Sequence, residues 1–243
     1  MNISICIRQI FGIAYLTSRW IKRQPTWLLQ SVLSYIGFAI LLYAWGGITG
    51  LKNLIIAMLI SGFWSVGVNI VGQEIGWARI SGTQDMFIAS PIKPLHFVIG
   101  IFIMSLIFPL IDLIALIPIV YILNAWNIMI LALVIGLPVL LIGIMLGLII
   151  VMRVKTPVNV SAITNPISWL LTILPPVYYP AWIIPEPARY IALTIPTSAS
   201  AEIVRQLIGM GTSVPLWYPV IVVVLWITIG ILTASKTIRW GLE

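Results

Sequence analysis

Few residues of this sequence have side chains that could act as acid–base groups or metal ligands. The 243 residues include six carboxylic acids, one histidine, His96, and one cysteine, Cys6. An intramolecular disulfide needs two cysteines and a zinc site needs several sulfur or imidazole ligands, so we predict neither a disulfide nor a metal site. His96 stands at the start of a long apolar run, where we expect an interfacial, hydrogen-bonded side chain and not a ligand.

Asp112 is the one acidic residue inside a long apolar run. A carboxylate is costly to bury in a bilayer, so we expect Asp112 to face other helices or a wet cavity. A structural aspartate, or one exposed to an exit cavity, is favoured over a proton or sodium relay, because a relay needs partner acids and the other apolar runs contain none. Most of a span separates Asp112 from His96, so no catalytic cluster is predicted and the chain is not expected to be an enzyme.

The composition is that of an all-α integral membrane protein. Hydrophobic residues make up 61% of the sequence and charged residues 8%, and the apolar runs are continuous instead of alternating as the strands of a barrel would be. Pro166, Pro175 and Pro176 interrupt the fifth run, which could be broken or partly re-entrant. Within a single domain, 1–243, we predict six transmembrane helices at about 28–48, 54–72, 97–123, 128–152, 160–177 and 216–235.

Small residues in the fourth predicted span indicate close helix packing. Gly143 and Gly147 are four residues apart and so lie on one helix face. Such pairs let a second helix approach closely in a membrane, although they also occur by chance in apolar sequences.

The basic residues are distributed unequally across the predicted spans. Cytoplasmic loops of membrane proteins carry an excess of Lys and Arg, so we predict a multi-pass protein of the cell membrane with both termini cytoplasmic. Since the charges are dispersed along the membrane edges, a nucleic-acid partner is not expected. Ten basic residues lie on the cytoplasmic side and three on the other: Arg8, Arg19, Lys22, Arg23, Arg79, Lys93, Arg153, Lys155, Lys236 and Arg239, against Lys52, Arg189 and Arg205.

The first 25 residues have the period of a helix and lack the single short apolar block of a signal peptide. We predict an amphipathic interfacial helix at 1–25, followed by the six-span bundle at 26–243. It would lie along the cytoplasmic membrane surface, either as an anchor or as a lever joined to a cytoplasmic partner. Its polar side carries Arg8, Gly12, Tyr15, Arg19, Lys22 and Arg23, and its apolar side carries Ile3, Ile7, Ile10, Ile13, Ala14 and Ile21.

The predicted cytoplasmic loop at 73–96 contains four of the few charges, Glu74, Arg79, Asp85 and Lys93. Within it we predict a helix of about two turns at 82–90. Thr83 would be its N-cap, Asp85 would favour its positive end, and Pro91 would stop it after Ser90. Its apolar residues, Met86, Phe87 and Ile88, suit insertion into a groove of another protein; the alternative is that they return into the lipid or the bundle.

This segment resembles the cytoplasmic loop of the type-2 permease subunit of ABC exporters. That family has Gly-Thr-x-Glu, a short apolar stretch and Ser-Pro at this place. Here Gly82, Thr83, Ser90 and Pro91 match at the same spacing, and Asp85 stands where the family has Glu. The resemblance implies a coupling helix that docks into an ATPase subunit. The ATPase-coupling residues would then be Arg79, Gly82, Thr83, Asp85, Met86, Phe87, Ser90 and Pro91.

A second match to the same family lies before the last span. Pro180, Pro185, Pro196, Glu202 and Arg205 keep the family's spacing, whereas Ile195, Thr197 and Ala199 depart from its Asn, Leu and Tyr. The region is too rich in proline to span a bilayer and too apolar for a free loop, so we expect re-entrant helices that dip into the outer leaflet. Glu202 and Arg205, three residues apart, would pair with each other; the alternative is that they contact a leaving substrate or gate the outer mouth.

The resemblance implies an exporter driven by ATP that another chain hydrolyses. A P-loop needs a Gly-Lys pair, and no lysine of this sequence follows a glycine. No cofactor is therefore expected in this chain: two partner ATPase subunits would bind ATP and Mg. A second permease subunit, in a homodimer or heterodimer, and membrane lipids complete the expected partners. The alternative is an ion-coupled secondary transporter that uses Asp112, although the repeat-related second polar site that it predicts is not evident.

Overall fold

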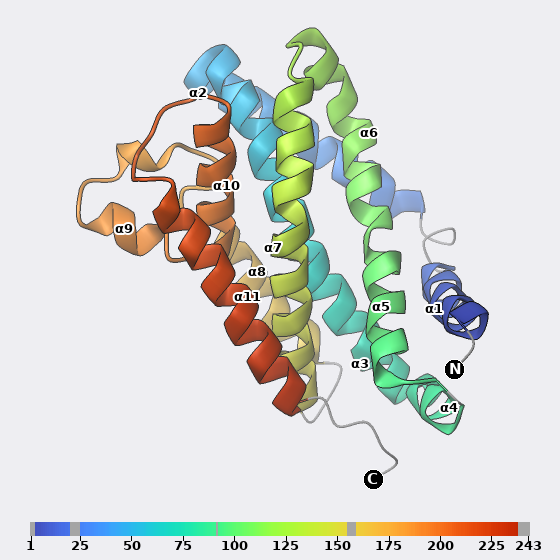
Figure 1. Ribbon diagram of the computed structural model, residues 1–243. Coiled ribbons are helices and arrows are strands. Elements are labelled where there is room, and N and C mark those ends of the chain that lie inside the picture. Colours follow the sequence, from blue (N-terminus) through green and yellow to red (C-terminus); the bar gives the residue numbers. More distant parts are fainter. Residues whose placement is uncertain (1–2, 20–24, 91, 155–158, 238–243) are drawn as a thin grey trace.

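The computed structural model describes residues 3–19, 25–90, 92–154 and 159–237, except for some side chains, among them that of Arg79. The described residues form helices and no strands, as predicted (Figure 1). Three stretches are long and apolar enough to cross a membrane: Val32–Gly76, Leu95–Ile122 and Trp126–Arg153. The helices are α1 (Ile3–Ser18), α2 (Pro25–Ser65), the π-helix η2 (Val66–Val71), α3 (Gly72–Ile80), α4 (Thr83–Ala89), α5 (Pro94–Ser105), α6 (Ile107–Ile122), α7 (Trp126–Arg153), α8 (Val160–Ile173), the 3₁₀-helix η4 (Ala181–Ile183), α9 (Ala188–Ala192), α10 (Pro196–Leu207) and α11 (Trp217–Thr237).

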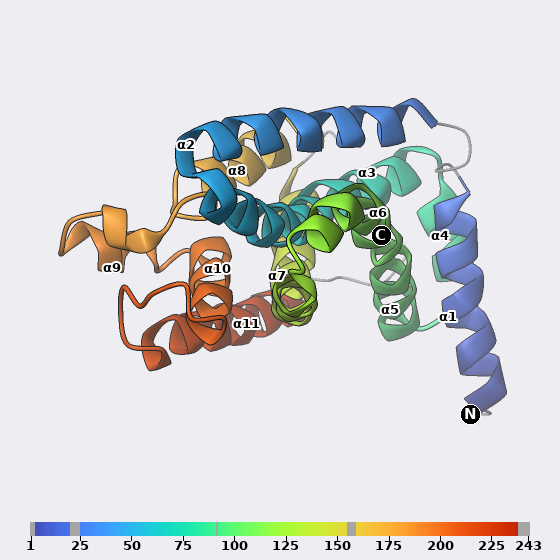
Figure 2. The same cartoon turned by 90° about the horizontal axis from the view of Figure 1, so that it is seen from above.

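Helix α2 consists of two helices that fold back on each other. Gly47 has φ 55° and ψ −137°, a non-helical conformation that glycine adopts readily because it has no Cβ. A Cβ on Gly50 would lie 1.9 Å from the Leu42 carbonyl oxygen, so the two arms touch where the chain reverses. Figures 1 and 2 show the arms, residues 25–46 and 48–65, running back from a common turn and diverging from each other. They correspond to the first two predicted spans.

The second arm of α2 continues as helix beyond its predicted end. It passes through η2 into α3, so residues 73–80, which the sequence analysis placed in a loop, are helical. The charges of this stretch suggested a loop, but no proline interrupts it. Ile75 is buried, and Gly72 lies against Gly147 of α7. Packing against α7 therefore extends the helix into the polar segment.

Prolines divide or shorten two other predicted spans. The third is made of α5 and α6, which meet at Leu106; Pro109 has no N–H to donate to the Ser105 carbonyl, so the helix is interrupted there. The fifth was expected at 160–177, but α8 ends at Ile173, before Pro175 and Pro176. A helix of 14 residues is roughly 21 Å long, less than the roughly 30 Å apolar core of a bilayer.

Helix α7 occupies the middle of the molecule, in contact with α2, η2, α3, α10 and α11 (Figure 1). The predicted small-residue face is confirmed here. A Cβ on Gly143 would lie 3.0 Å from the Trp64 carbonyl oxygen, and one on Gly147 would lie 2.9 Å from that of Val68. Gly67 faces them from η2. The two backbones thus approach closely because neither side carries a side chain at the contact.

Replacing Gly67 by alanine is expected to lower the free energy of unfolding by about 1–3 kcal/mol, because its Cβ would lie 2.7 Å from the Leu140 carbonyl oxygen and 2.8 Å from the Gly143 carbonyl carbon. Gly37→Ala is the matched control, since nothing lies within 4 Å of a Cβ there. Thermal unfolding in detergent measures both. Equal melting temperatures for the two variants would contradict the close packing of η2 on α7.

Helix α1 lies across one end of the bundle, crosswise to α5 and α7 (Figures 1 and 2). Ile13 is buried against Gly100 of α5, where a Cβ would lie 2.8 Å from the isoleucine side chain. Ile7, on the same predicted apolar side, is exposed. The predicted amphipathic helix is therefore present over 3–18 and only part of its apolar side is covered; Lys22 and Arg23 lie outside the described residues.

Candidate functional site

Helix α4 lies at the same end of the molecule as α1 and the last turns of α7 and α11 (Figure 1). The predicted two-turn helix is confirmed, but its N-cap is not Thr83. Gly82 takes that position with φ 70°, which disfavours any residue with a Cβ, and Thr83 is the first helical residue. The Thr83 hydroxyl instead hydrogen-bonds that of Ser81, at 2.8 Å. Gly82 thus sets the turn between α3 and α4.

The side chains of α4 divide into an exposed and an inward set. Asp85, in the first turn, is exposed, and Met86 is 72% exposed. Phe87 is only 9% exposed, and its ring centroid lies 5.5 Å from that of Phe97 in α5. The Ser90 hydroxyl donates to the Phe87 carbonyl at 2.7 Å and closes the helix.

Of the three apolar residues of α4 that were expected to face outward, only Met86 is exposed. Ile88 is half-buried and Phe87 packs inward. Phe87 holds the helix to the bundle, so it is not available as a contact for another protein. Pro91 and the side chain of Arg79, two more of the predicted coupling residues, lie outside the described residues.

A cavity of about 550 Å³ lies where α1, α3, α4 and α5 meet. Leu16, Glu74, Ile75 and Met86 contribute to its walls, together with Phe87. The adjoining contact of α1 with α5 is fixed by His96, whose Nδ1 lies 2.7 Å from Gln9 Oε1. The prediction of a hydrogen-bonded His96 is confirmed, and the contact connects α1 to the helix that also holds α4.

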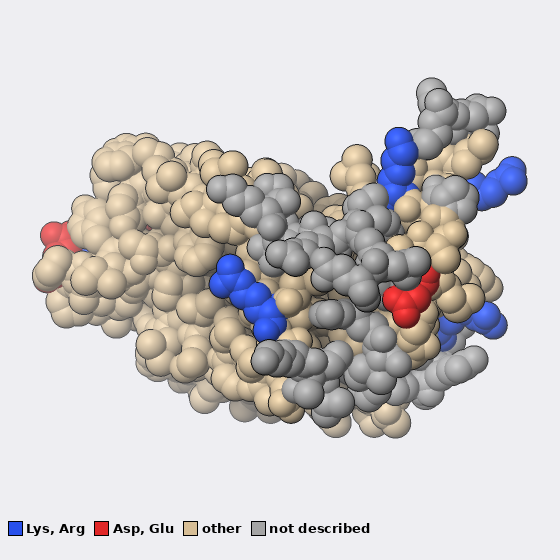
Figure 3. Space-filling view, turned by 90° about the horizontal axis from the view of Figure 1, so that it is seen from below, with Lys and Arg blue, Asp and Glu red and all other residues tan. Residues whose placement is uncertain are grey.

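The face of the molecule at this end carries scattered Lys and Arg side chains (Figure 3). Arg8, Arg19, Lys93 and Arg153 are exposed there. At the opposite end, Lys52 and Arg189 are half-buried. The exposed positive charge of the described residues is thus concentrated on the side that carries α4.

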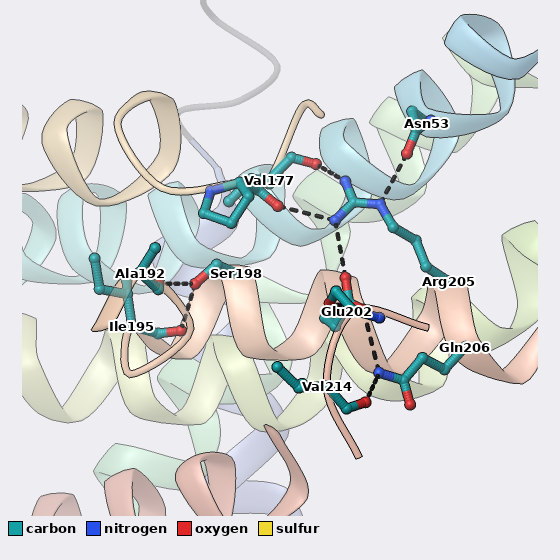
Figure 4. Close-up of polar contacts among 11 residues, drawn as sticks. Asn53, Val177, Ala192, Ile195, Ser198, Glu202, Arg205, Gln206 and Val214 are labelled. Carbon is teal, nitrogen blue, oxygen red and sulfur yellow. Dashed lines mark hydrogen bonds and ion pairs between the residues drawn. The ribbon is translucent and has the colours of Figure 1, made fainter. Parts of the chain in front are cut away.

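Arg205 in α10 is 2% exposed and donates hydrogen bonds to three acceptors in two separate segments (Figure 4). Its Nε bonds Asn53 Oδ1 in the second arm of α2 at 2.8 Å, and its two terminal nitrogens bond the carbonyls of Pro176 and Val177. The Arg205 guanidinium also lies 3.8 Å from the Glu202 carboxylate, which confirms the predicted pair. Burial lowers the pKa of Arg205 to about 10, and the charge of Glu202 opposes that shift, so the guanidinium stays cationic at neutral pH.

Glu202 is as buried as Arg205, and three groups donate hydrogen bonds to its carboxylate. The Ser213 hydroxyl and backbone N–H, and the Gln206 amide, all donate to its Oε1. The pair thus connects α2, the segment after α8, α10 and the loop before α11. Because protein groups satisfy both side chains, this geometry favours a structural role over contact with a substrate.

The three prolines predicted to shape this region occupy helix starts or exposed turns. Pro180 precedes η4, Pro196 is the first residue of α10 and is buried, and Pro185 is exposed. Proline suits the first helical position because its missing N–H would have no partner there. Residues 181–207 therefore form three short helices in place of one span.

Asp112 is 7% exposed in α6 and lines a cavity of about 430 Å³ between the two arms of α2, α6 and α8. The Tyr35 hydroxyl donates a hydrogen bond to its carboxyl group. The Ser61 and Tyr178 hydroxyls lie 3.1 Å apart in the same wall. The expectation that Asp112 faces the bundle or a cavity is confirmed, and this cavity is the second candidate site.

The other polar walls of the cavity come from several helices, and sequence reasoning did not single them out. Single hydroxyls or amides in an apolar run are weak signals, and only the fold brings them together. They are Gln30, Ser34, Ser65, Asn69, Gln73, Asn165, Ser168 and Thr172.

The described helices define an all-helical protein whose long apolar stretches fit a membrane-embedded protein. Comparison of the sequence with protein families and with curated proteins finds no match.

Proposed function

We propose that this chain is the transmembrane permease subunit of an ABC exporter, which moves a substrate out of the cytoplasm with ATP hydrolysed by a separate subunit. The observation that carries the proposal is α4: a short helix at the positively charged end of the bundle, exposed at Asp85 and Met86 and anchored through Phe87. A rigid helix with an apolar and an acidic contact suits a groove in a soluble partner.

A continuous helical connection supports the coupling of this helix to a transport path. α4 follows α3 after a two-residue turn, and α3 continues through η2 into the second arm of α2. That arm supplies Ser61 and Gly62 to the Asp112 cavity, and η2 supplies Asn69. Movement of α4 on a closing ATPase dimer would therefore shift one wall of the cavity. ATP then biases a two-state bundle through the different contacts of its two states.

The proposal includes the topology and the partners. The two arms of α2, the α5–α6 pair, α7, α8 with the segment after it, and α11 would be the six spans, with α9 and α10 re-entrant from outside. Both termini would be cytoplasmic in the cell membrane, where cytoplasmic Lys and Arg are in excess. Two ATPase subunits would bind ATP and Mg, and a second permease subunit, identical or different, would complete the transporter.

Reversing the charge and polarity of the exposed face of α4 tests the proposal. Asp85→Lys combined with Met86→Asp is expected to reduce copurification of an ATP-hydrolysing subunit from native membranes, in mild detergent, at least about tenfold, the effect of losing about 1.4 kcal/mol of binding. Glu186→Lys is the control, because it replaces an exposed acid by lysine near α9, at the other end. Thermal unfolding of the Asp85/Met86 variant should be unchanged, and that of Glu186→Lys should change by at most about 1 kcal/mol, because the exposed pair with Arg189 that it removes contributes little.

Two results would overturn the docking assignment. One is undiminished copurification of the ATPase with the Asp85/Met86 variant. The other is a wild-type preparation that retains no ATP-hydrolysing subunit at all.

The buried Asp112 favours a second candidate, an ion-coupled secondary transporter, because a carboxyl group in a polar cavity within the bundle is the arrangement such carriers use. Transport by the purified chain alone in vesicles, driven by a proton or sodium gradient without ATP, would support this candidate. Dependence of the same transport on an ATPase subunit would exclude it.

A further inference from the structure

The cavity at Asp112 contains a carboxyl group with no cationic side chain beside it among the described residues. Among the described residues that line it are one carboxyl group and no Lys, Arg or His side chain. The carboxyl group is held in place: Tyr35 donates to it, and its Oδ2 lies 2.8 Å from the position of a Cβ on Gly62. A Cβ at position 62 would displace the carboxylate from this place beside the α2 backbone.

A buried carboxylate favours a cation as its neighbour. One hydrogen bond from a neutral hydroxyl stabilises the anion but supplies no positive charge. Burying an unpaired charge costs roughly several kcal/mol of free energy. A ligand that brings its own positive charge removes this cost. An anionic ligand would increase it.

The remaining walls suit the apolar body of such a ligand. The rings of Phe38 and Tyr178 are stacked with centroids 5.1 Å apart, and Trp169 contributes a third aromatic side chain. Met58 and Ile70 add apolar surface. Aromatic faces attract cations as well as apolar groups, and the volume of about 430 Å³ is in the range of small-molecule sites.

We propose that this cavity binds an organic cation, with an ammonium group at Asp112 and an apolar body against Phe38, Tyr178 and Trp169. The inference deepens the proposed function by naming a substrate class. The term substrate rests on that function, whereas binding to the cavity does not.

Binding to the purified chain in a maltoside detergent, which carries no charge, tests the inference. The probes are a dansyl-labelled pentylammonium and a dansyl-labelled pentanol, which differ in the charged group, and fluorescence anisotropy measures their affinities. The wild type should bind the ammonium probe at least about tenfold more tightly than the alcohol, as expected for about 1.4 kcal/mol of charge recognition. Equal affinities in the wild type would overturn the inference without any variant.

Asp112→Asn should abolish the preference for the ammonium probe while it leaves the affinity for the alcohol within about twofold. Asp85→Asn is the matched control: it removes the same charge from exposed α4 and should keep the preference. A preference that survives in Asp112→Asn would overturn the inference. If that variant does not fold, Gly62→Ala serves instead, because its Cβ displaces the Asp112 carboxylate; an undiminished preference in it would equally be contrary to the inference.

The ammonium group could belong to a soluble amphiphile or to a lipid headgroup, and added lipid distinguishes these sources. Competition by phosphatidylethanolamine and not by phosphatidylglycerol would assign the site to a lipid ammonium. Absence of competition by either would assign it to a soluble cation. Neither ATP nor an ATPase subunit is present in this experiment, so its failure and the failure of the proposed function are separate results.

Discussion

Replacing Arg205 by methionine should lower the free energy of unfolding by about 3–5 kcal/mol, the largest effect expected of any single substitution proposed for this protein. The substitution leaves the carbonyls of Pro176 and Val177 and the Asn53 amide oxygen without their donor. It also leaves Glu202 as a buried acid without its cation. Thermal or denaturant unfolding of the purified chain measures the loss.

Two further variants show whether this effect arises from the buried contacts. Arg153→Met removes the same charge from an exposed position at the end of α7 and should change stability by less than about 0.5 kcal/mol. Arg205→Lys keeps the charge but cannot reach three acceptors in the fixed geometry of a guanidinium, so it should recover only part of the loss. If Arg205→Met were as stable as Arg153→Met, the structural role of the Arg205 network would be wrong.

Replacing Phe87 by alanine is expected to lower the free energy of unfolding by about 3 kcal/mol, because it removes a buried ring that packs on Phe97 and leaves a cavity. The neighbouring Met86→Ala is the control, since its side chain is 72% exposed and its loss should cost less than about 0.5 kcal/mol. Thermal unfolding compares the two. Limited proteolysis should also show faster cleavage around α4 in Phe87→Ala alone.

The same two variants separate anchoring from docking. Under the proposed function, Met86→Ala weakens the ATPase contact while the bundle keeps its stability, whereas Phe87→Ala weakens both. Equal stability of the two variants would show that Phe87 does not hold α4 to α5.

Local patterns in the sequence predicted the helices and the contacts between near neighbours. The Glu202–Arg205 pair follows from a spacing of three residues, and the Gly143–Gly147 face follows from a spacing of four. The ends of α7 and α11 lie within a few residues of the predicted spans. These features depend on the helix period alone, which the spacing of residues in the sequence indicates directly.

Contacts between distant segments were not predictable in the same way. Asn53 is 152 residues from Arg205, so nothing in either local sequence indicates their hydrogen bond. The inward direction of Phe87 depends on where Phe97 lies, and the helical character of α3 depends on packing against α7. Tertiary contacts thus decided between the two directions that the sequence left open for the apolar side chains of α4, and they made a helix of residues 73–80, for which the predicted loop was wrong.

The π-helix η2 changes the phase of the helix that connects the Asp112 cavity with α4. A π-helical turn contains roughly one more residue than an α-helical turn, so the side chains beyond it point in other directions than a continuous α-helix would give them. Asn69, within η2, lines the Asp112 cavity, whereas Glu74 and Ile75, beyond it in α3, line the cavity beside α4. The same turn therefore sets which side chains of this one helical path face each of the two cavities.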